Sequence, residues 1–194
     1  NQSILILYNG NDWKLNEPDY SPSQKMAYSL WGDICKTTNI NLYRASIKWF
    51  DQNKFCKGWM YIDSKWCKIN KTIRPTVIYD KCVTYNKDTG ELLMDIMNKK
   101  IQIEKSFTII NSTSFDTLFD NKLNQAIIFK GYLPKNIFMQ AGEVIENKEG
   151  KRIVIKNIRG SGGKQVTITD KKNIEIKNNS LVQEFIDAKE NGIL

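Results

Sequence analysis

Short apolar runs separated by turn residues dominate the hydrophobic pattern of this chain. Residues 3–8 read Ser-Ile-Leu-Ile-Leu-Tyr and are followed by polar turn residues, which predicts a buried strand. Residues 24–36 then place apolar side chains at helical spacing, with Ser21 available as the N-cap. Residues 76–80 form another short apolar strand that ends at an acidic residue, and residues 91–97 have a helical pattern. Strands alternating with helices indicate a mostly parallel sheet in this part of the chain.

Aromatic residues are concentrated between residues 46 and 69, where they alternate with polar and turn residues. This pattern is typical of hairpins. The aromatic side chains do not lie among an excess of arginines, so we interpret them as sheet core rather than as a platform for stacked bases. The residues concerned are Trp49, Phe50, Phe55, Trp59, Tyr61 and Trp66.

The pattern changes near residue 105, where we place a domain boundary. Beyond it, a helix or pair of helices is expected at 115–129, and a helical turn at 141–147. Strands are expected at 107–110, 136–140, 152–157, 165–168, 174–177 and 181–186. No internal repeat or low-complexity linker is present in the sequence.

The residue types that are present restrict the chemistry. The chain has four cysteines without the paired C-x-x-C spacing of zinc sites, so reduced thiols are expected. It has no histidine, which excludes Ser-His and Cys-His nucleophiles and any histidine general base. No apolar run approaches the roughly 18 residues that cross a bilayer, and no secretory signal is visible. A cytoplasmic location without a membrane partner is therefore expected.

The formal net charge of the chain is +8, and the basic excess is spread along its whole length. Acidic residues interrupt most basic clusters, whereas nucleic-acid-binding proteins usually concentrate Lys and Arg on one stripe. Nucleic acid is therefore not the favoured partner, although a basic nucleic-acid-binding domain stays open as an alternative. A site for nucleotide phosphates fits the modest positive charge equally well.

The segment 152–166 carries the most specific chemical signal. Lys156 ends an apolar strand, and the glycine-rich run 160–163 follows it, so backbone N–H groups of a loop could surround phosphate oxygens beside an ammonium group. A Walker A loop would need Gly at Ile158 and Ser or Thr at Gln165. The dinucleotide fingerprint also fails, because two glycines are adjacent and a strand rather than a helix follows the loop.

This segment resembles the glycine-rich loop of the ATP-grasp superfamily, and three further segments resemble that family in the same order. Residues 109–112 and 119–122 resemble its strand, short helix and first ATP-binding lysine. Residues 132–138 resemble its leader and following strand, and residues 181–186 its hinge strand. Residues 1–100, including the strand at 75–81, resemble the preceding α/β domain of the same family, so the resemblance covers nearly the whole chain.

The resemblance implies an α/β fold with three parts. Residues 1–105 are expected to form a Rossmann-like pre-ATP-grasp domain, and residues 106–180 the α+β small subdomain of the ATP-grasp fold with its glycine-rich loop. Residues 181–194 would form the hinge strand and the start of the large subdomain.

The resemblance also assigns roles to individual residues. Lys122 and Lys156 would bind the phosphates of ATP, and the loop residues would close over them. Arg159 would reach the substrate carboxylate or the acyl-phosphate. The loop residues are Gly160, Ser161, Gly162 and Gly163, and the residues expected around adenine and ribose are Gln183, Glu184, Phe185, Ile186 and either Asp187 or Glu190. A surface lysine, a plain hairpin turn and an ordinary amphipathic strand are the structural alternatives for these segments.

The activity implied by the resemblance is that of an ATP-dependent ligase. ATP and Mg²⁺ would be used to activate a small-molecule or peptide carboxylate as an acyl-phosphate, which an amine then attacks. The metal ligands of the family lie beyond residue 194, so none is assigned within this chain, which alone would be inactive. A non-catalytic ATP-binding module is the alternative function, and oligomerisation stays open.

Overall fold

The computed structural model describes residues 2–86, 91–159 and 165–187. The chain forms two compact units. The first unit comprises Asn1–Thr84 and Leu93–Thr113, and the second comprises Tyr85–Leu92 and Ser114–Leu194. Each unit is described separately below.

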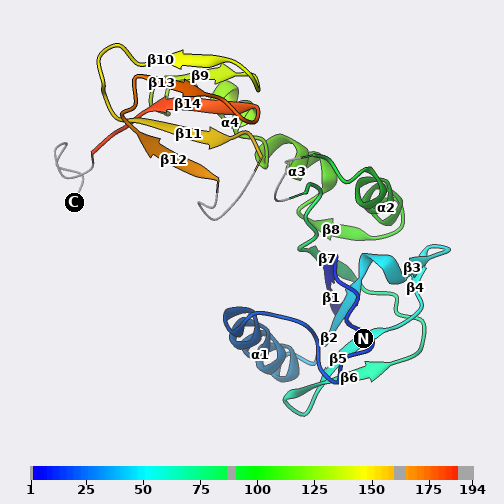
Figure 1. Ribbon diagram of the computed structural model, residues 1–194. Helices are drawn as coiled ribbons and strands as arrows, with labels where there is room; N and C mark the ends of the chain where they lie inside the picture. Colours follow the sequence, from blue (N-terminus) through cyan, green and yellow to red (C-terminus); the bar gives the residue numbers. More distant parts are fainter. Residues whose placement is uncertain (1, 87–90, 160–164, 188–194) are drawn as a thin grey trace. The chain divides into compact units, whose positions relative to one another are not determined.

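The first unit is built around a six-stranded sheet with the strand order β6-β5-β2-β1-β7-β8 (Figure 1). The strands β2, β1, β7 and β8 are parallel to one another, and β5 and β6 extend the sheet as an antiparallel hairpin. The elements of this unit are β1 (Ser3–Tyr8), α1 (Pro22–Thr37), β2 (Asn41–Ser46), a 3₁₀ turn (Ile47–Trp49), β3 (Phe50–Asp51), β4 (Lys54–Phe55), β5 (Gly58–Ile62), β6 (Lys65–Ile69), β7 (Val77–Asp80), α2 (Met94–Glu104) and β8 (Thr108–Ile110).

The central strand β1 is buried on both faces, because Leu5, Ile6 and Leu7 are all fully inaccessible to solvent. Leu5 and Leu7 join a core that contains Trp59 and most of the other aromatic residues of segment 46–69. Ile6 points to the opposite face and packs with Tyr28 of α1. The continuous apolar run of β1 is the pattern of a parallel strand covered on both sides. The buried strand and the mostly parallel sheet predicted from the sequence are confirmed, because β1 lies inside the sheet and pairs with β7 in parallel.

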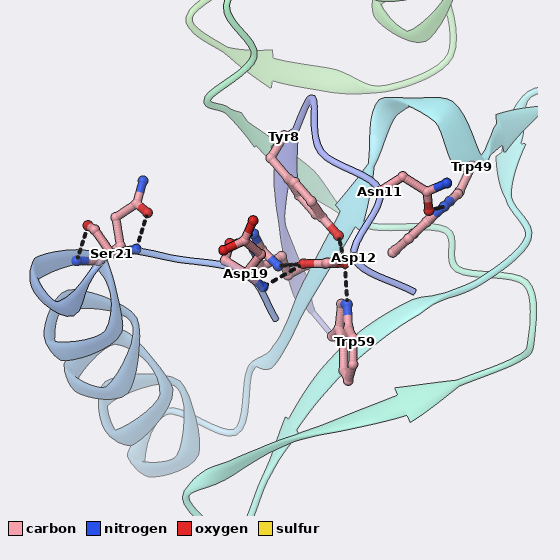
Figure 2. A network of polar contacts seen from close by, with 9 residues as sticks. Tyr8, Asn11, Asp12, Asp19, Ser21, Trp49 and Trp59 are labelled. Carbon is pink, nitrogen blue, oxygen red and sulfur yellow. Dashed lines mark hydrogen bonds and ion pairs between the residues drawn. The ribbon is translucent and has the colours of Figure 1, made fainter. Parts of the chain in front are cut away.

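Helix α1 begins with a complete capping box. The Ser21 hydroxyl accepts a hydrogen bond from the Gln24 amide at 3.3 Å, and the Gln24 side chain accepts one from the Ser21 amide at 3.0 Å. The two bonds satisfy backbone donors that would otherwise have no partner at the helix start. The predicted N-cap is therefore confirmed (Figure 2).

A buried carboxylate, Asp12, anchors the loop that connects β1 to α1 (Figure 2). Its Oδ1 accepts hydrogen bonds from the Tyr8 hydroxyl and from Trp59 Nε1, the latter at 2.9 Å. Its Oδ2 accepts from the Asp19 amide at 2.9 Å and forms an ion pair with the Arg44 guanidinium. All of these partners are donors, so they satisfy a carboxylate that is only 4% exposed.

The second unit contains a four-stranded antiparallel sheet with the order β12-β11-β14-β9 and a two-stranded antiparallel sheet of β10 and β13. Strands β11 and β12, which flank the glycine-rich run in the sequence, are antiparallel neighbours. The elements are α3 (Thr113–Phe119), α4 (Lys122–Ile128), β9 (Asn136–Met139), β10 (Val144–Glu146), β11 (Ile153–Asn157), β12 (Val166–Thr169), β13 (Asn173–Glu175) and β14 (Ser180–Glu184).

The α/β class followed by an antiparallel sheet agrees with the fold predicted from the sequence. The helical turn predicted at 141–147 was wrong, because residues 144–146 form β10, which pairs with β13. The sequence analysis placed the domain boundary near residue 105, whereas β8 pairs with β7 and the first unit continues to Thr113. No helix in the described part of the chain is long and apolar enough to cross a membrane.

We predict that Asp12→Asn destabilises the protein by about 3–5 kcal/mol, because it leaves the buried guanidinium of Arg44 without its charge partner. Burial alone would raise the pKa of Asp12, but hydrogen bonds from Tyr8, Trp59, Arg44 and the Asp19 amide together hold this pKa below its ordinary value of 3.8. The stabilisation of the fold by the ionised Asp12 carboxylate is therefore present above pH 3.8 and is lost as the pH falls through the lower pKa of the folded state.

Urea denaturation followed by tryptophan fluorescence, repeated between neutral and acid pH, measures this effect. The difference in unfolding free energy between wild type and Asp12→Asn should shrink as the pH falls. Asp33→Asn on the exposed surface of α1 is the matched control and should change stability by less than about 0.5 kcal/mol. Equal stability of Asp12→Asn and wild type at neutral pH would contradict the anchoring role of Asp12.

Candidate functional site

The four-stranded sheet of the second unit brings Lys156 of β11 and Gln183 of β14 onto one face. Lys156 lies opposite Leu181, and Gln183 lies opposite Val154, so directly paired and alternate residues share that face. The Lys156 ammonium group donates a hydrogen bond to Gln183 Oε1 at 2.5 Å. We call this the lysine face, and it consists of Asn136, Phe138, Val154, Lys156, Val166, Ile168, Leu181 and Gln183.

Lys122 reaches the same region because the start of α4 is fixed to the end of β11. The Lys122 amide donates to the carbonyl of Ile158 at 2.8 Å, two residues beyond Lys156. Asn121 caps α4 by accepting from the Leu123 amide at 2.9 Å, and it forms a bridge with Arg159. These bonds hold Lys122, the first residue of α4, near Lys156, the second-last residue of β11.

The two lysines are close enough to influence each other electrostatically. The pKa of Lys122 is lowered, first because burial disfavours its charged form and second because the positive charge of Lys156 repels it. The negative charge of Asp120 opposes the shift without cancelling it. A pair of neighbouring ammonium groups is suited to binding a ligand with several negative charges.

Apolar side chains lie beside these cations on the lysine face. Val166 and Ile168 of β12 are 37% and 55% exposed, and Val154 of β11 is partly buried between β12 and β14. A flat, uncharged ring could cover these side chains while a charged tail reaches the lysines. The sequence analysis did not assign a role to these three residues. The alternation of apolar residues along β11 and β12 was the signal in the sequence, but the register between the strands decides whether these residues share a face.

The other half of the lysine face lies next to α4 and the segment that follows it. A groove of about 510 Å³ is lined there by side chains of both, together with residues of β9 and β14. Helix α4 thus occupies the β9 side of the sheet, and the β11–β12 side carries the exposed apolar residues. The lining residues are Leu123, Ala126, Ile127, Lys130, Leu133, Pro134, Lys135, Asn136, Phe138 and Leu181.

The structure does not bring the Glu184 side chain onto the lysine face. Glu184 lies opposite Ile153, so its side chain belongs to the other face of the sheet from that of Gln183. Its Oε1 accepts from the Lys135 amide at 3.1 Å, and its own amide donates to the Lys135 carbonyl at 3.0 Å. Of these neighbours, only Gln183 presents its side chain beside Lys156.

Residues beyond β14 contact Arg152 instead of the lysines. The Arg152 guanidinium lies 4.1 Å from the centre of the Phe185 ring and forms an ion pair with Asp187 at 3.2 Å. These residues line an open depression of about 580 Å³, and Ile186 is 46% exposed. The carboxylate of Asp187 is therefore already paired with Arg152.

The remaining predicted site residues are Arg159 and the loop that follows it. The Arg159 amide donates to Asn157 Oδ1 at 3.0 Å, which fixes the backbone directly after β11. The predicted residues Gly160, Ser161, Gly162, Gly163 and Glu190 lie outside the described residues. The cysteines are free thiols, as predicted, and the described residues contain no cluster of metal-ligating side chains.

The class of protein follows from this fold together with a family comparison. Residues 119–194 match the family model of an ATP-grasp domain, so this part of the chain is similar to that family. Comparison with curated protein sequences gave no match.

Solved structures share the fold over most of this chain at low sequence identity. They include a D-alanyl-alanine synthetase A from Vibrio cholerae, with a TM-score of 0.53 and 12% identity, covering 96% of this chain and 60% of that one. The VanG D-Ala:D-Ser ligase from Enterococcus faecalis has a TM-score of 0.52 and 13% identity, covering 96% and 63%. The D-cycloserine synthetase DcsG has a TM-score of 0.55 and 9% identity, covering 94% and 59%. This chain therefore spans about 60% of the length of these structures.

We predict that Lys156→Gln raises the pKa of Lys122, because it removes the repulsion of the neighbouring ammonium group. NMR titration of the lysine side-chain signals measures this pKa directly. Lys171→Gln removes the same charge from an exposed turn and should leave the pKa of Lys122 unchanged. Equal pKa values of Lys122 in wild type and Lys156→Gln would show that the two ammonium groups are not neighbours.

Proposed function

We propose that this chain is the N-terminal part of an ATP-dependent ligase that joins a carboxylate to an amine. The observation that carries the proposal is the pair of neighbouring cations Lys122 and Lys156, of which Lys156 lies on the lysine face beside exposed apolar residues. A nucleotide triphosphate has this combination of a multiply charged tail and a flat base. The ATP-grasp family match over residues 119–194 supports the same ligand.

In this proposal, Lys122 and Lys156 bind phosphate oxygens of ATP, and Val154, Val166 and Ile168 contact the base. A substrate carboxylate oxygen attacks the γ-phosphorus, the bond to the β-phosphate oxygen breaks, and ADP leaves with that electron pair. The amine nitrogen then attacks the acyl carbon, phosphate leaves and the amine loses a proton. The two ammonium groups stabilise negative charge that shifts onto the departing phosphate oxygens.

The remaining predicted residues keep their proposed roles. Gln183 and the backbone of Ile186 read the edge of adenine, and Arg159 contacts the substrate carboxylate. Of the acidic candidates for ribose, Asp187 is already paired with Arg152, which favours Glu190. The loop Gly160, Ser161, Gly162 and Gly163 is proposed to cover the phosphates.

The part of the chain that the structure describes contains no cluster of side chains suited to binding Mg²⁺. Because the described residues contain no group of three potential metal ligands, none of them is assigned to Mg²⁺ and no step is derived through it. The carboxylate is proposed to be that of a small molecule or a peptide. The names of the structurally similar proteins, which include a D-Ala:D-Ser ligase, support an amino acid as one such substrate.

We predict that Lys122→Ala and Lys156→Ala in the full-length protein each weaken ATP binding about tenfold or more, because each removes a charge that contacts the phosphates. Calorimetric titration with ATP and Mg²⁺ measures the affinity. Lys171→Ala removes a lysine from an exposed turn and serves as the control that should bind ATP like wild type. Wild-type affinity in both variants would reject the lysine face as the phosphate site.

We also predict that the 194-residue chain alone binds ATP weakly and that Mg²⁺ adds little to its affinity. The reason is that its described residues provide cations and an apolar strip but no metal-ligand cluster. The same titration, carried out on this chain and on the full-length protein with and without Mg²⁺, provides the comparison. Tight, Mg²⁺-dependent binding by residues 1–194 would place the metal ligands within this chain.

A further inference from the structure

The amide of Gln183 is buried and its orientation is chemically determined. Gln183 is 6% exposed, and its Oε1 accepts from the Lys156 ammonium group at 2.5 Å. An ammonium group can only donate hydrogen bonds, so the oxygen rather than the nitrogen of the amide must face it. The side chain of Gln183 therefore acts as a fixed acceptor that holds the end of the Lys156 side chain in place.

The partner that holds Lys156 carries no charge. In the first unit, by contrast, the fully buried Lys100 ammonium lies 2.5 Å from the carboxylate of Asp80. Within the described ranges, Lys156 forms no ion pair with any carboxylate. An amide oxygen satisfies a donor without cancelling its positive charge.

We propose that Gln183 is a positioning residue that fixes Lys156 while preserving its charge, and that this makes the site select nucleotides by their number of phosphates. A neutral acceptor at this position leaves the full attraction of Lys156 for a triphosphate, whereas a carboxylate would cancel much of it. The proposal rests on the proposed function, since it assigns the charge of Lys156 to the phosphates of ATP.

Positioning of Lys156 and recognition of adenine predict different effects on the affinities for ATP, ADP and AMP. A residue that only contacts the base affects ATP, ADP and AMP by the same factor, because all of them contain adenine. A residue that acts through the charge of Lys156 affects ATP most and AMP least. Gln183→Glu separates the two roles, because it keeps the size and shape of the side chain and adds one negative charge beside the ammonium group.

The test measures dissociation constants of ATP, ADP and AMP for the full-length protein by calorimetry. In Gln183→Glu, the preference for ATP over AMP should fall about tenfold, and the dependence of ATP affinity on salt concentration should become weaker. Thr167→Glu is the matched control, because it adds the same charge on the exposed, opposite face of β12. It should leave the preference for ATP unchanged.

A second variant separates charge from hydrogen bonding. Gln183→Met removes the acceptor but adds no charge, so ATP should bind more weakly while the salt dependence stays that of wild type. Equal weakening of ATP, ADP and AMP in Gln183→Glu would show that Gln183 acts only by reading the base, and it would overturn the inference while leaving the ATP site intact.

A measurement without nucleotide distinguishes failure of the inference from failure of the proposed function. If wild type binds none of the three nucleotides, the proposed ATP site is wrong. NMR titration of Lys122 then still tests the charge argument, because the carboxylate of Gln183→Glu should raise the pKa of Lys122. An unchanged pKa of Lys122 in this variant would overturn the inference even if ATP binds.

Discussion

The register between β11 and β14 is the constraint on which the candidate site depends. It places Lys156 opposite Leu181 and one step diagonally from Gln183, so the two polar side chains meet on one face. A slip of one residue would turn Lys156 to the other face of the sheet. The bonds that extend the pairing beyond the strand, from the Ile158 amide to Asn179 and from the Lys122 amide to Ile158, also bring in the start of α4. One register thus determines the positions of both lysines.

Local sequence patterns were sufficient to predict the strands that carry this site but not how they pair. The apolar run ending at Lys156 predicted β11, and the run from residue 181 predicted β14, because both are short and bounded by polar residues. The resemblance to the ATP-grasp family directed attention to Lys156 and Gln183 individually. Their hydrogen bond joins residues far apart in the chain, and its existence follows from tertiary pairing that no local pattern contains. The opposite orientations of Gln183 and Glu184 likewise depend on which face of β14 lies beside Lys156.

Helix α1 shows why an apolar stripe does not by itself identify a buried face. The sequence places Met26, Leu30 and Ile34 at helical spacing, yet all three are more than half exposed. The buried face contains Gly32, where a Cβ atom would lie 2.0 Å from the ring of Tyr61. A side chain at position 32 would therefore prevent the close approach of helix and sheet. Propensity favours other residues in a helix, so the value of this glycine becomes visible only when the neighbouring strand is known.

The two units differ in how the charges of their lysines and arginines are paired. In the first unit, Arg44 and Lys100 are almost completely buried and each is paired with a carboxylate, so their charges are compensated within the fold. Such pairs hold loops and strand ends but leave little electrostatic attraction for a ligand. In the second unit, Lys156 is held by a neutral amide, and its positive charge contributes to the lowered pKa of Lys122. In the proposed function, a bound nucleotide anion offsets this repulsion, because both ammonium groups are then attracted to the same negative charge. The proposed ATP site therefore combines the positive charge of Lys156 with the apolar surface that Val166 and Ile168 expose on the same sheet.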